Sequence, residues 1–275
     1  MIDVSLYTGF YPFRYLPPTH GRGIFDLMKQ IGCEWCVATA FPSIFYKDCL
    51  DGLKRTIDET EGCGEKVFHY AVINPAFPGW QQDLDEALKL PGVVGVRLFP
   101  RYHHYDLCSK EFLKLMETTA ERNVPVNLTA RLVDERLGHW LIDGLPSLQL
   151  YEIEIFLKKC RNTTVIMSMF DSYEYNEPVL PMSGRSATLL EIVKSHPNAF
   201  IDIGGCTKPN FFWFEKLVKQ IDPSRLILGT GAPLYYHGGT LFSLEKAKIE
   251  SSIKMKILHD NAQVLFRIGG DHANH

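Results

Sequence analysis

Two adjacent histidines, His103 and His104, lie between Tyr102 and Tyr105, shortly after an apolar run of the sequence. Imidazole titrates near neutral pH, so a histidine at the mouth of a site can act as a general acid or base. A histidine in an ordinary loop is more often only solvated. We therefore hold both residues as candidates for catalytic proton transfer, with solvation as the alternative.

Two charged residues belong to other apolar runs. Arg97 falls in the run 93–98, and its planar guanidinium suits a carboxylate or a phosphate group. Asp202 lies within the run 200–203, where an ionised carboxylate needs a partner. Both residues are candidates for binding a substrate. The alternative is a structural ion pair between them.

Two further charged residues follow apolar runs. Asp171 comes after the run 164–167 and is a candidate catalytic base or polar anchor. Arg131 follows the run 124–128 and is a second candidate for binding an anion. It opens the segment RLVDER (131–136), which could instead be a surface loop held by its own ion pairs.

Aromatic side chains stand in and after the first run and after the last. Tyr7 precedes the segment FYPFR (10–14), and Tyr235, Tyr236 and His237 follow the last run. They could form an aromatic wall around a small molecule, because ligand pockets combine an apolar lining with a few polar groups. The alternative is a packed surface in which the rings only fill space.

The elements that must position these residues repeat one pattern, in which a short apolar run leads through a polar loop to a segment of helical periodicity. The runs are continuous rather than alternating, which is typical of parallel strands buried on both faces. Strands are predicted at residues 2–6, 34–38, 67–73, 93–98, 124–128, 164–167, 200–203 and 226–228.

Helices are predicted at 46–61, 81–90, 109–122, 189–195, 213–219 and 244–266, the last broken near His259. Eight strands alternating with helices favour an α/β fold, a single (β/α)8 TIM barrel that forms one domain over residues 1–275. The glycine-rich fingerprint of a dinucleotide site is absent, which disfavours a nucleotide-dependent oxidoreductase. Active sites of such barrels lie in the loops after the strands.

The composition is that of an ordinary globular protein: of 275 residues, 45% are hydrophobic and 22% are charged. The net charge of −3 offers no basic excess for a phosphate backbone, so we expect no nucleic acid partner. Neither a signal peptide nor an apolar run long enough for a bilayer is visible, which predicts a cytoplasmic protein without a membrane partner.

The seven cysteines are odd in number and spread through predicted strands and helices, which favours reduced thiols over a disulfide framework. Cys33 and Cys36 form a CxxC pair. A zinc site of this kind usually needs a second pair of cysteines or histidines, and none is visible. We therefore interpret the pair as a chance spacing and predict no cofactor.

Four segments carry a family resemblance that runs nearly from end to end of the chain. They are GVRLFPRYHHY (95–105), LILGTGAP (226–233), NAQVLF (261–266) and IDVSLYTG (2–9). They resemble, respectively, the fourth-strand segment, the eighth-strand FGSDAP turn, the closing GNAxRLF helix and the opening IDxHxHxG of the amidohydrolase-related family. The resemblance implies a TIM barrel and, for typical members, metal-assisted hydrolysis.

The departures from the family pattern fall on its metal ligands. The resemblance places the His-x-His pair of strand one on Ser5 and Tyr7, and the histidine of strand five on Thr129. The strand-six histidine falls near Met169 and the strand-eight aspartate on Gly231. Imidazole and carboxylate are the donors that hold zinc and similar ions, and these residues cannot replace that set. We therefore expect no metal.

Two functions remain open. The first is a metal-independent hydrolase that acts on a small carboxylated substrate, such as a lactone or an amide, by general acid–base chemistry. The second is a non-catalytic member of the family that binds a small anionic molecule or supports an active paralogue. In either case, a homo-oligomer or a hetero-oligomer with an active paralogue is an open alternative to a single chain.

Overall fold

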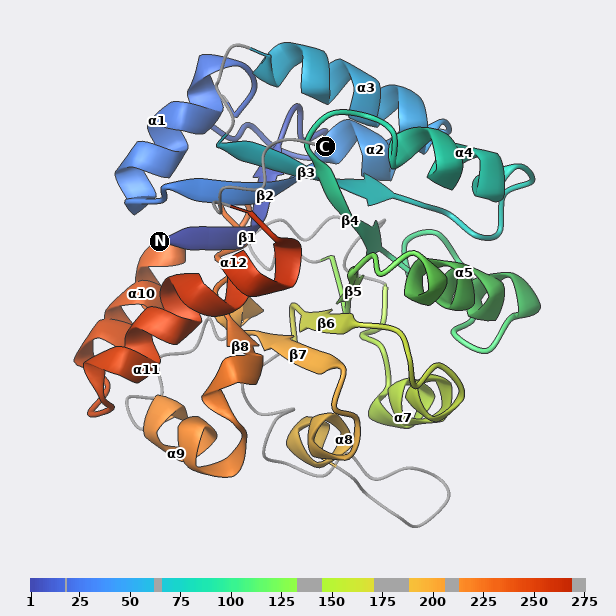
Figure 1. The fold of residues 1–275 in the computed structure, drawn as a ribbon. Coiled ribbons are helices and arrows are strands. Elements are labelled where there is room, and N and C mark those ends of the chain that lie inside the picture. The colour runs from blue at the N-terminus through green and yellow to red at the C-terminus, as the bar shows by residue number, and fades with distance from the viewer. Residues whose placement is uncertain (18, 62–65, 133–144, 171–187, 206–212, 269–275) are drawn as a thin grey trace.

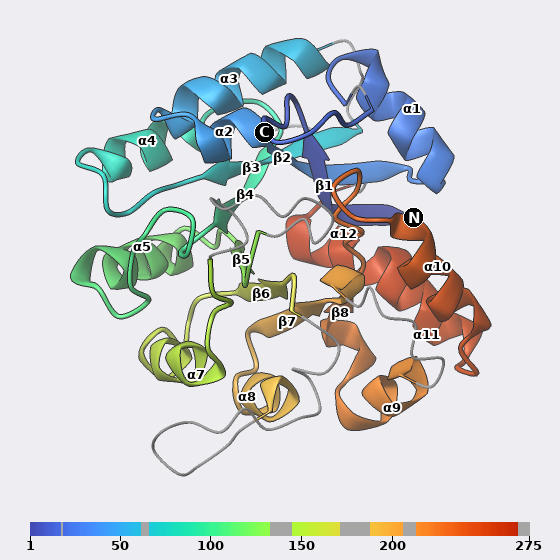
Figure 2. The ribbon, with the colours of Figure 1, turned by 180° about the vertical axis from the view of Figure 1, so that it is seen from behind.

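The computed structural model describes the chain except for residue 18 and residues 62–65, 133–144, 171–187, 206–212 and 269–275. Within the described residues, eight parallel strands form one sheet in the order β1 to β8. Figures 1 and 2 show these strands around a common centre with helices outside them. The prediction of a (β/α)8 barrel is confirmed.

Every predicted strand overlaps an observed one, because the short runs of β-branched and apolar residues mark the buried strands directly. The observed strands are β1 (Ile2–Thr8), β2 (Trp35–Ala40), β3 (Val67–Val72), β4 (Val93–Leu98), β5 (Val126–Thr129), β6 (Val165–Ser168), β7 (Ala199–Asp202) and β8 (Leu226–Ile227).

Backbone hydrogen bonds between the first strand and the last close the ring. The amide of Val4 donates to the carbonyl of Leu228 at 2.9 Å, and the amide of Tyr7 donates to the carbonyl of Ala232 at 2.8 Å. Closure removes the exposed edges that an open sheet would have. It also brings the turn after β8 against β1.

A buried carboxylate strengthens this closure. Asp3 accepts hydrogen bonds from the amide of Thr230 at 3.0 Å and from its hydroxyl at 2.5 Å. Burial raises the pKa of Asp3, and the hydrogen bonds from Thr230 oppose that rise. One side chain of β1 therefore fixes the turn that follows β8.

Besides α7 (Leu150–Lys159), which was not predicted, the helices differ from the prediction in three places. A helix α1 at Arg22–Ile31 was not predicted, although Ile24, Met28 and Ile31 recur at helical spacing and are buried. The short α2 (Phe41–Phe45) was missed as well, and the helix predicted at 46–61 begins only at Cys49, after the cap Asp48. The further helices are α3 (Cys49–Thr60), α4 (Trp80–Ala87), α5 (Lys110–Glu121), α7 (Leu150–Lys159), α8 (Leu189–Ser195), α9 (Trp213–Gln220), α10 (His237–Lys246), α11 (Ser251–Met255) and α12 (Asn261–Phe266).

The third difference concerns the last helical segment. The break predicted near His259 was wrong, because α10 ends before Ala247 and the next helix begins at Ser251. At His259 the chain continues as a π-helical segment, Lys256–Asp260, which leads directly into α12. The helix widens there without ending.

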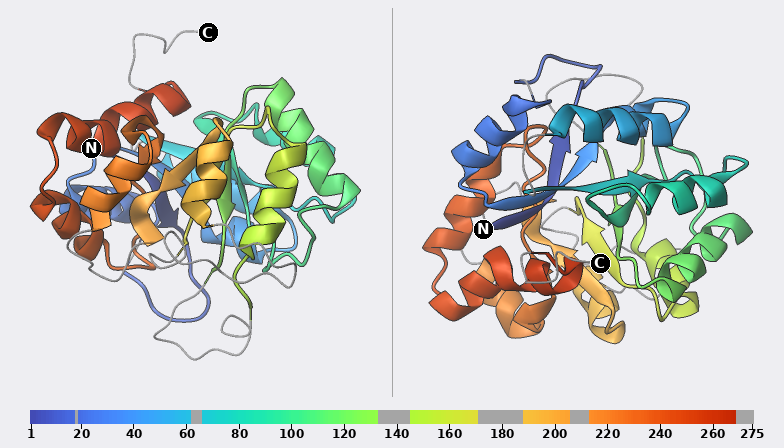
Figure 3. Two further views of the ribbon diagram at one scale, coloured as in Figure 1. Left: turned by 90° about the horizontal axis from the view of Figure 1, so that it is seen from below. Right: turned by 45° about the horizontal axis from the view of Figure 1, so that its top comes forward.

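The described residues form four clusters of buried apolar side chains, and two of them pack the two sides of the strands. The larger cluster lies between the strands and the surrounding helices. Figure 3 shows these strands and helices in two views. The second contains strand residues such as Val4, Val37 and Ile166, together with Ala262 and Phe266 of α12. Figure 1 shows α12 across one end of the ring. No described helix is long and apolar enough to cross a membrane.

His69 of β3 should make unfolding sensitive to acid. Its side chain is buried, its Nε2 lies 3.3 Å from the hydroxyl of Thr60, and burial lowers its pKa from 6.5 to about 4. Between these two values the unfolded chain binds more protons than the folded one, so this contribution to stability is lost as the pH falls. The loss amounts to about 2 kcal/mol at pH 4.5.

The measurement compares the free energy of unfolding of wild type and His69→Gln in denaturant at pH 7 and pH 4.5. Glutamine does not titrate, so the variant should gain on the wild type as the pH falls. A difference between the two proteins that stays constant with pH would show that His69 is not held neutral by burial.

Candidate functional site

The C-terminal ends of the strands form a polar layer around Arg97. The guanidinium is fully buried and donates three hydrogen bonds to side chains of three other strands. Nε donates to the hydroxyl of Thr129 at 3.0 Å, one terminal nitrogen to Thr39 at 2.9 Å, and the other to Tyr7 at 3.0 Å. Strand alternation places these residues on the inner side of the barrel.

Aromatic rings surround the same positive charge. The guanidinium carbon of Arg97 lies 4.7 Å from the ring centre of Tyr7, 5.5 Å from that of Phe99 and 5.9 Å from that of Tyr70. Ring faces attract cations, and the attraction grows when water is excluded. Arg97 is therefore held by hydroxyl acceptors and ring faces together.

Asp202 lies in the same layer but is not the direct partner of Arg97 that the sequence suggested. One carboxylate oxygen accepts from the hydroxyl of Ser168 at 2.7 Å and the other from the amide of Gly204 at 2.8 Å. No described carboxylate lies within 4.0 Å of the Arg97 guanidinium. Burial raises the pKa of Asp202 to about 6, against the hydrogen bonds and the more distant charge of Arg97. The two charges thus balance each other across the layer.

Gly229 allows this layer to pack against the turn after β8. A Cβ atom at Gly229 would stand 2.5 Å from a carboxylate oxygen of Asp202 and 2.5 Å from Cβ of Ser5. Such distances are far inside van der Waals contact, so only glycine fits. The hydroxyl of Ser5 is buried there, and the part of the chain that the structure describes offers it no hydrogen-bond partner.

An apolar cluster covers the polar layer. The ring of Tyr7 stacks on Phe41 with 5.0 Å between the ring centres. A Cβ at Gly231, whose φ is 68°, would meet the ring of Tyr235 at 2.7 Å and the terminal methyl of Met169 at 2.8 Å. The buried members of the cluster are Tyr7, Tyr11, Leu16, Phe41, Ile44, Cys49, Val72, Phe99, Leu132, Met169 and Leu234.

The two predicted histidines have different surroundings. Nε2 of His103 lies 3.0 Å from the carbonyl oxygen of Ile44, and its Nδ1 is buried with no hydrogen-bond partner among the described residues. Burial lowers the pKa of His103, so the ring is neutral at neutral pH. His104 is exposed and adopts a φ of 54°. Neither histidine contacts Arg97.

The remaining predicted residues are scattered. Asp171 lies outside the described residues. Arg131 is half-buried and has a partner. Tyr236 is exposed, and its ring centre lies 5.5 Å from that of His237, whose pKa burial lowers. Of the sequence candidates, Arg97, Tyr7 and Asp202 share the polar layer, and Tyr235 packs in the cluster above it.

Sequence reasoning missed two residues of the layer, Thr39 and Ser168. Each stands at the end of a strand, at or next to its last residue, where active sites of barrels gather their side chains. That position was the available signal. A hydroxyl at a strand end does not by itself indicate a site, because serine and threonine occur in many strands and turns.

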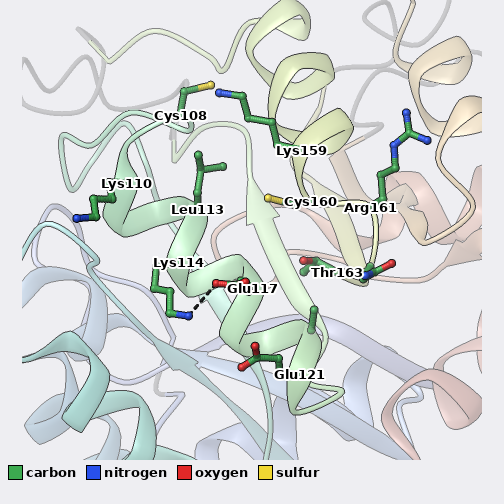
Figure 4. A pocket seen from close by; sticks show the side chains of 12 residues that line it. Cys108, Lys110, Leu113, Lys114, Glu117, Glu121, Lys159, Cys160, Arg161 and Thr163 are labelled. Atoms are coloured by element: carbon green, nitrogen blue, oxygen red, sulfur yellow. Dashed lines mark hydrogen bonds and ion pairs between the residues drawn. The ribbon is translucent and has the colours of Figure 1, made fainter.

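A groove of about 860 Å³ lies on the outer wall, between α5 and α7 (Figure 4). Lys114 and Glu117 form an exposed ion pair of 2.8 Å in it. None of its lining residues belongs to the polar layer. They are Cys108, Lys110, Leu113, Lys114, Glu117, Ala120, Glu121, Lys159, Cys160, Arg161, Asn162 and Thr163.

A family model described as Amidohydrolase matches residues 38–268. The chain belongs to the amidohydrolase family. This match confirms the resemblance that the four sequence segments indicated. No curated protein sequence matches the chain.

Solved structures of other proteins share the fold of this amidohydrolase-family chain. A 5-carboxyvanillate decarboxylase from Sphingomonas paucimobilis has a TM-score of 0.69 at 10% identity, covering 98% of this chain and 99% of its own. A 2,6-dihydroxybenzoate decarboxylase in complex with 2,6-dihydroxybenzoate has 0.68 at 13%, covering 97% and 98%. A dihydroxybenzoic acid decarboxylase from Polaromonas, with bound manganese and the inhibitor 2-nitroresorcinol, has 0.66 at 15%, covering 97% and 96%.

The described residues of this family member do not fit a divalent cation. Where the resemblance places ligands, Tyr7 and Thr129 already accept hydrogen bonds from Arg97, and the space beside Gly231 is filled by Met169 and Tyr235. Among the described residues, no group of three or more His, Cys, Asp or Glu side chains could hold a metal. Neutral hydroxyl and thioether groups are weak ligands for zinc or manganese.

The substitution Asp202→Asn should change how the free energy of unfolding depends on pH, because it removes a buried carboxyl group with a raised pKa. Because its pKa in the folded chain is about 6 against an ordinary 3.8, the folded chain holds this proton more tightly than the unfolded one. The contribution of Asp202 is therefore most favourable below pH 3.8 and is lost as the pH rises through 6.

Asparagine does not titrate, so between pH 5 and pH 8 the variant should gain about 1.5 kcal/mol on the wild type in free energy of unfolding. The measurement is denaturant unfolding of both proteins at the two pH values. Parallel stability curves would contradict the raised pKa.

Proposed function

We propose that the chain is a non-catalytic member of the amidohydrolase family, which works without a divalent cation and serves through its fold as a binding or structural subunit. The observation that carries this proposal is the closed environment of Arg97. Its guanidinium is fully buried and bonded to hydroxyls from three strands, beneath an apolar cluster.

The positions of the candidate acids and bases also support a non-catalytic function. A general base must reach the proton that it removes, directly or through one water. His103 has Nε2 at a backbone carbonyl, and His104 is exposed. Asp202 is fully buried and already accepts hydrogen bonds from Ser168 and Gly204. No described acid or base is therefore poised at an open mouth.

A second candidate is a metal-independent enzyme that acts on a small carboxylated substrate. Of the five N–H groups of Arg97, three have acceptors, and for the other two the described residues offer none. Two such groups suit a carboxylate. Structurally similar proteins that bind 2,6-dihydroxybenzoate or 2-nitroresorcinol show that this fold accommodates small aromatic anions. Entry here requires that the aromatic cluster above Arg97 opens.

The proposed function predicts little metal and no turnover. We expect protein purified without chelator, with its tag removed, to hold far less than one equivalent of zinc, manganese or iron by elemental analysis, because the donor set is missing. Incubation with manganese chloride followed by gel filtration should change nothing. Carboxylated aromatics such as 2,6-dihydroxybenzoate should release no carbon dioxide. One equivalent of barrel-bound metal, or turnover that a chelator abolishes, would end the proposal.

The second candidate is tested by binding. If Arg97 anchors a carboxylate, wild type should bind 2,6-dihydroxybenzoate in calorimetry, and Arg97→Met should weaken that binding by more than about 2 kcal/mol. Arg101→Met is the matched control, because Arg101 lies in the next loop and pairs with Glu152. Wild type that binds no small carboxylate leaves only the non-catalytic function.

A further inference from the structure

The surroundings of Arg97 have the form of a coordination site. Oxygen atoms from β1, β2 and β5 converge on one buried cation, those of Tyr7, Thr39 and Thr129. Each accepts from a different nitrogen of the guanidinium, so every nitrogen of the side chain makes one hydrogen bond. A buried arginine needs acceptors of this kind, and here all three are neutral hydroxyl groups.

Two of these three oxygens stand where the family resemblance places metal ligands. Tyr7 occupies the second histidine position of strand one, and Thr129 occupies the histidine position of strand five. A similar structure, the dihydroxybenzoic acid decarboxylase from Polaromonas, holds manganese. Metal and guanidinium cannot share these positions, since each needs the same inward side chains.

The charge of the layer is consistent with exchange of one cation for another. A guanidinium carries one positive charge, and it needs fewer anionic neighbours than a divalent ion. The strand-eight carboxylate of the family is replaced by Gly231, and Tyr235 fills the space beside it. Asp202 remains, fully buried, and its electrostatic interaction with Arg97 balances the charge that is left.

We infer that the guanidinium of Arg97 has taken the place of the divalent cation of the family and holds the strand ends together in its stead. Arg97 is thus a structural cation of the barrel. The inference rests on the proposed function only in that the barrel works without a metal ion.

Chemical rescue tests the inference. Arg97→Ala should unfold at a lower temperature than wild type, and guanidinium ion on the order of 10 mM should raise that temperature saturably by occupying the same acceptors. Urea, which has a similar shape but no charge, and sodium chloride at equal ionic strength should give no rise. Wild type should not be stabilised. A folded, destabilised Arg97→Ala that guanidinium does not rescue, or that urea rescues equally, overturns the inference.

A double-mutant cycle covers the case in which Arg97→Ala does not fold. Thr39→Val and Thr129→Val remove one acceptor each with little change in volume and should lower the unfolding temperature. In an Arg97→Met background their effect should largely disappear, because the N–H group that lost its acceptor is gone. Thr163→Val is the control, since its hydroxyl donates to the carbonyl of Met116 and should cost the same in both backgrounds. Additive costs at Thr39 and Thr129 would overturn the inference.

These outcomes are distinct from those for the proposed function. Turnover by metal-free protein would end the non-catalytic function and leave the rescue of Arg97→Ala intact. Failure of the rescue, or of the coupling, would end the inference about Arg97 and leave the absence of turnover unaffected.

Discussion

The side chains at the C-terminal ends of the strands are arranged around one buried positive charge, the guanidinium of Arg97. Removing a guanidinium from water costs several kcal/mol, and interactions inside the barrel must offset that desolvation cost. It does so with three hydroxyl acceptors, three ring faces and the more distant carboxylate of Asp202. Because these groups come from β1, β2, β3, β4, β5 and β7, the position of Arg97 fixes most of the strand ends relative to one another.

The packing of the turn after β8 follows from this arrangement. Asp202 must stay within reach of Ser168 and of the positive charge, which leaves no room for a side chain at Gly229. Asp3 holds the same turn from the other side through Thr230. A short loop is thereby fixed between two buried carboxylates, and the rings of the apolar cluster pack over the result.

The main apolar cores of the fold consist of other residues than those on which the family resemblance places metal ligands. The apolar cores between strands and helices, and between strands and α12, contain none of the five ligand positions Ser5, Tyr7, Thr129, Met169 and Gly231. Replacement of those ligands therefore leaves the main cores intact. Similar structures at 10 to 15% identity show the same barrel over nearly their whole length. A barrel of this kind can remain stable without a metal ion if other hydrogen bonds and charges hold the side chains of the polar layer together.

The sequence by itself determined the strands, the barrel and the family, and it has other residue types where the resemblance places metal ligands. Buried parallel strands appear as short apolar runs, and ligand positions are read one by one along the chain. The helix boundaries were predicted less accurately than the strands. The cap at Asp48 and the break at residues 247–250 depend on local geometry that periodicity does not encode. Tertiary structure alone decided which groups meet Arg97. Its acceptors lie 32, 58 and 90 residues away, so no local pattern pairs them. For the same reason, sequence could not tell that Asp202 bonds to Ser168 rather than directly to Arg97, since barrel curvature and side-chain conformation set that distance.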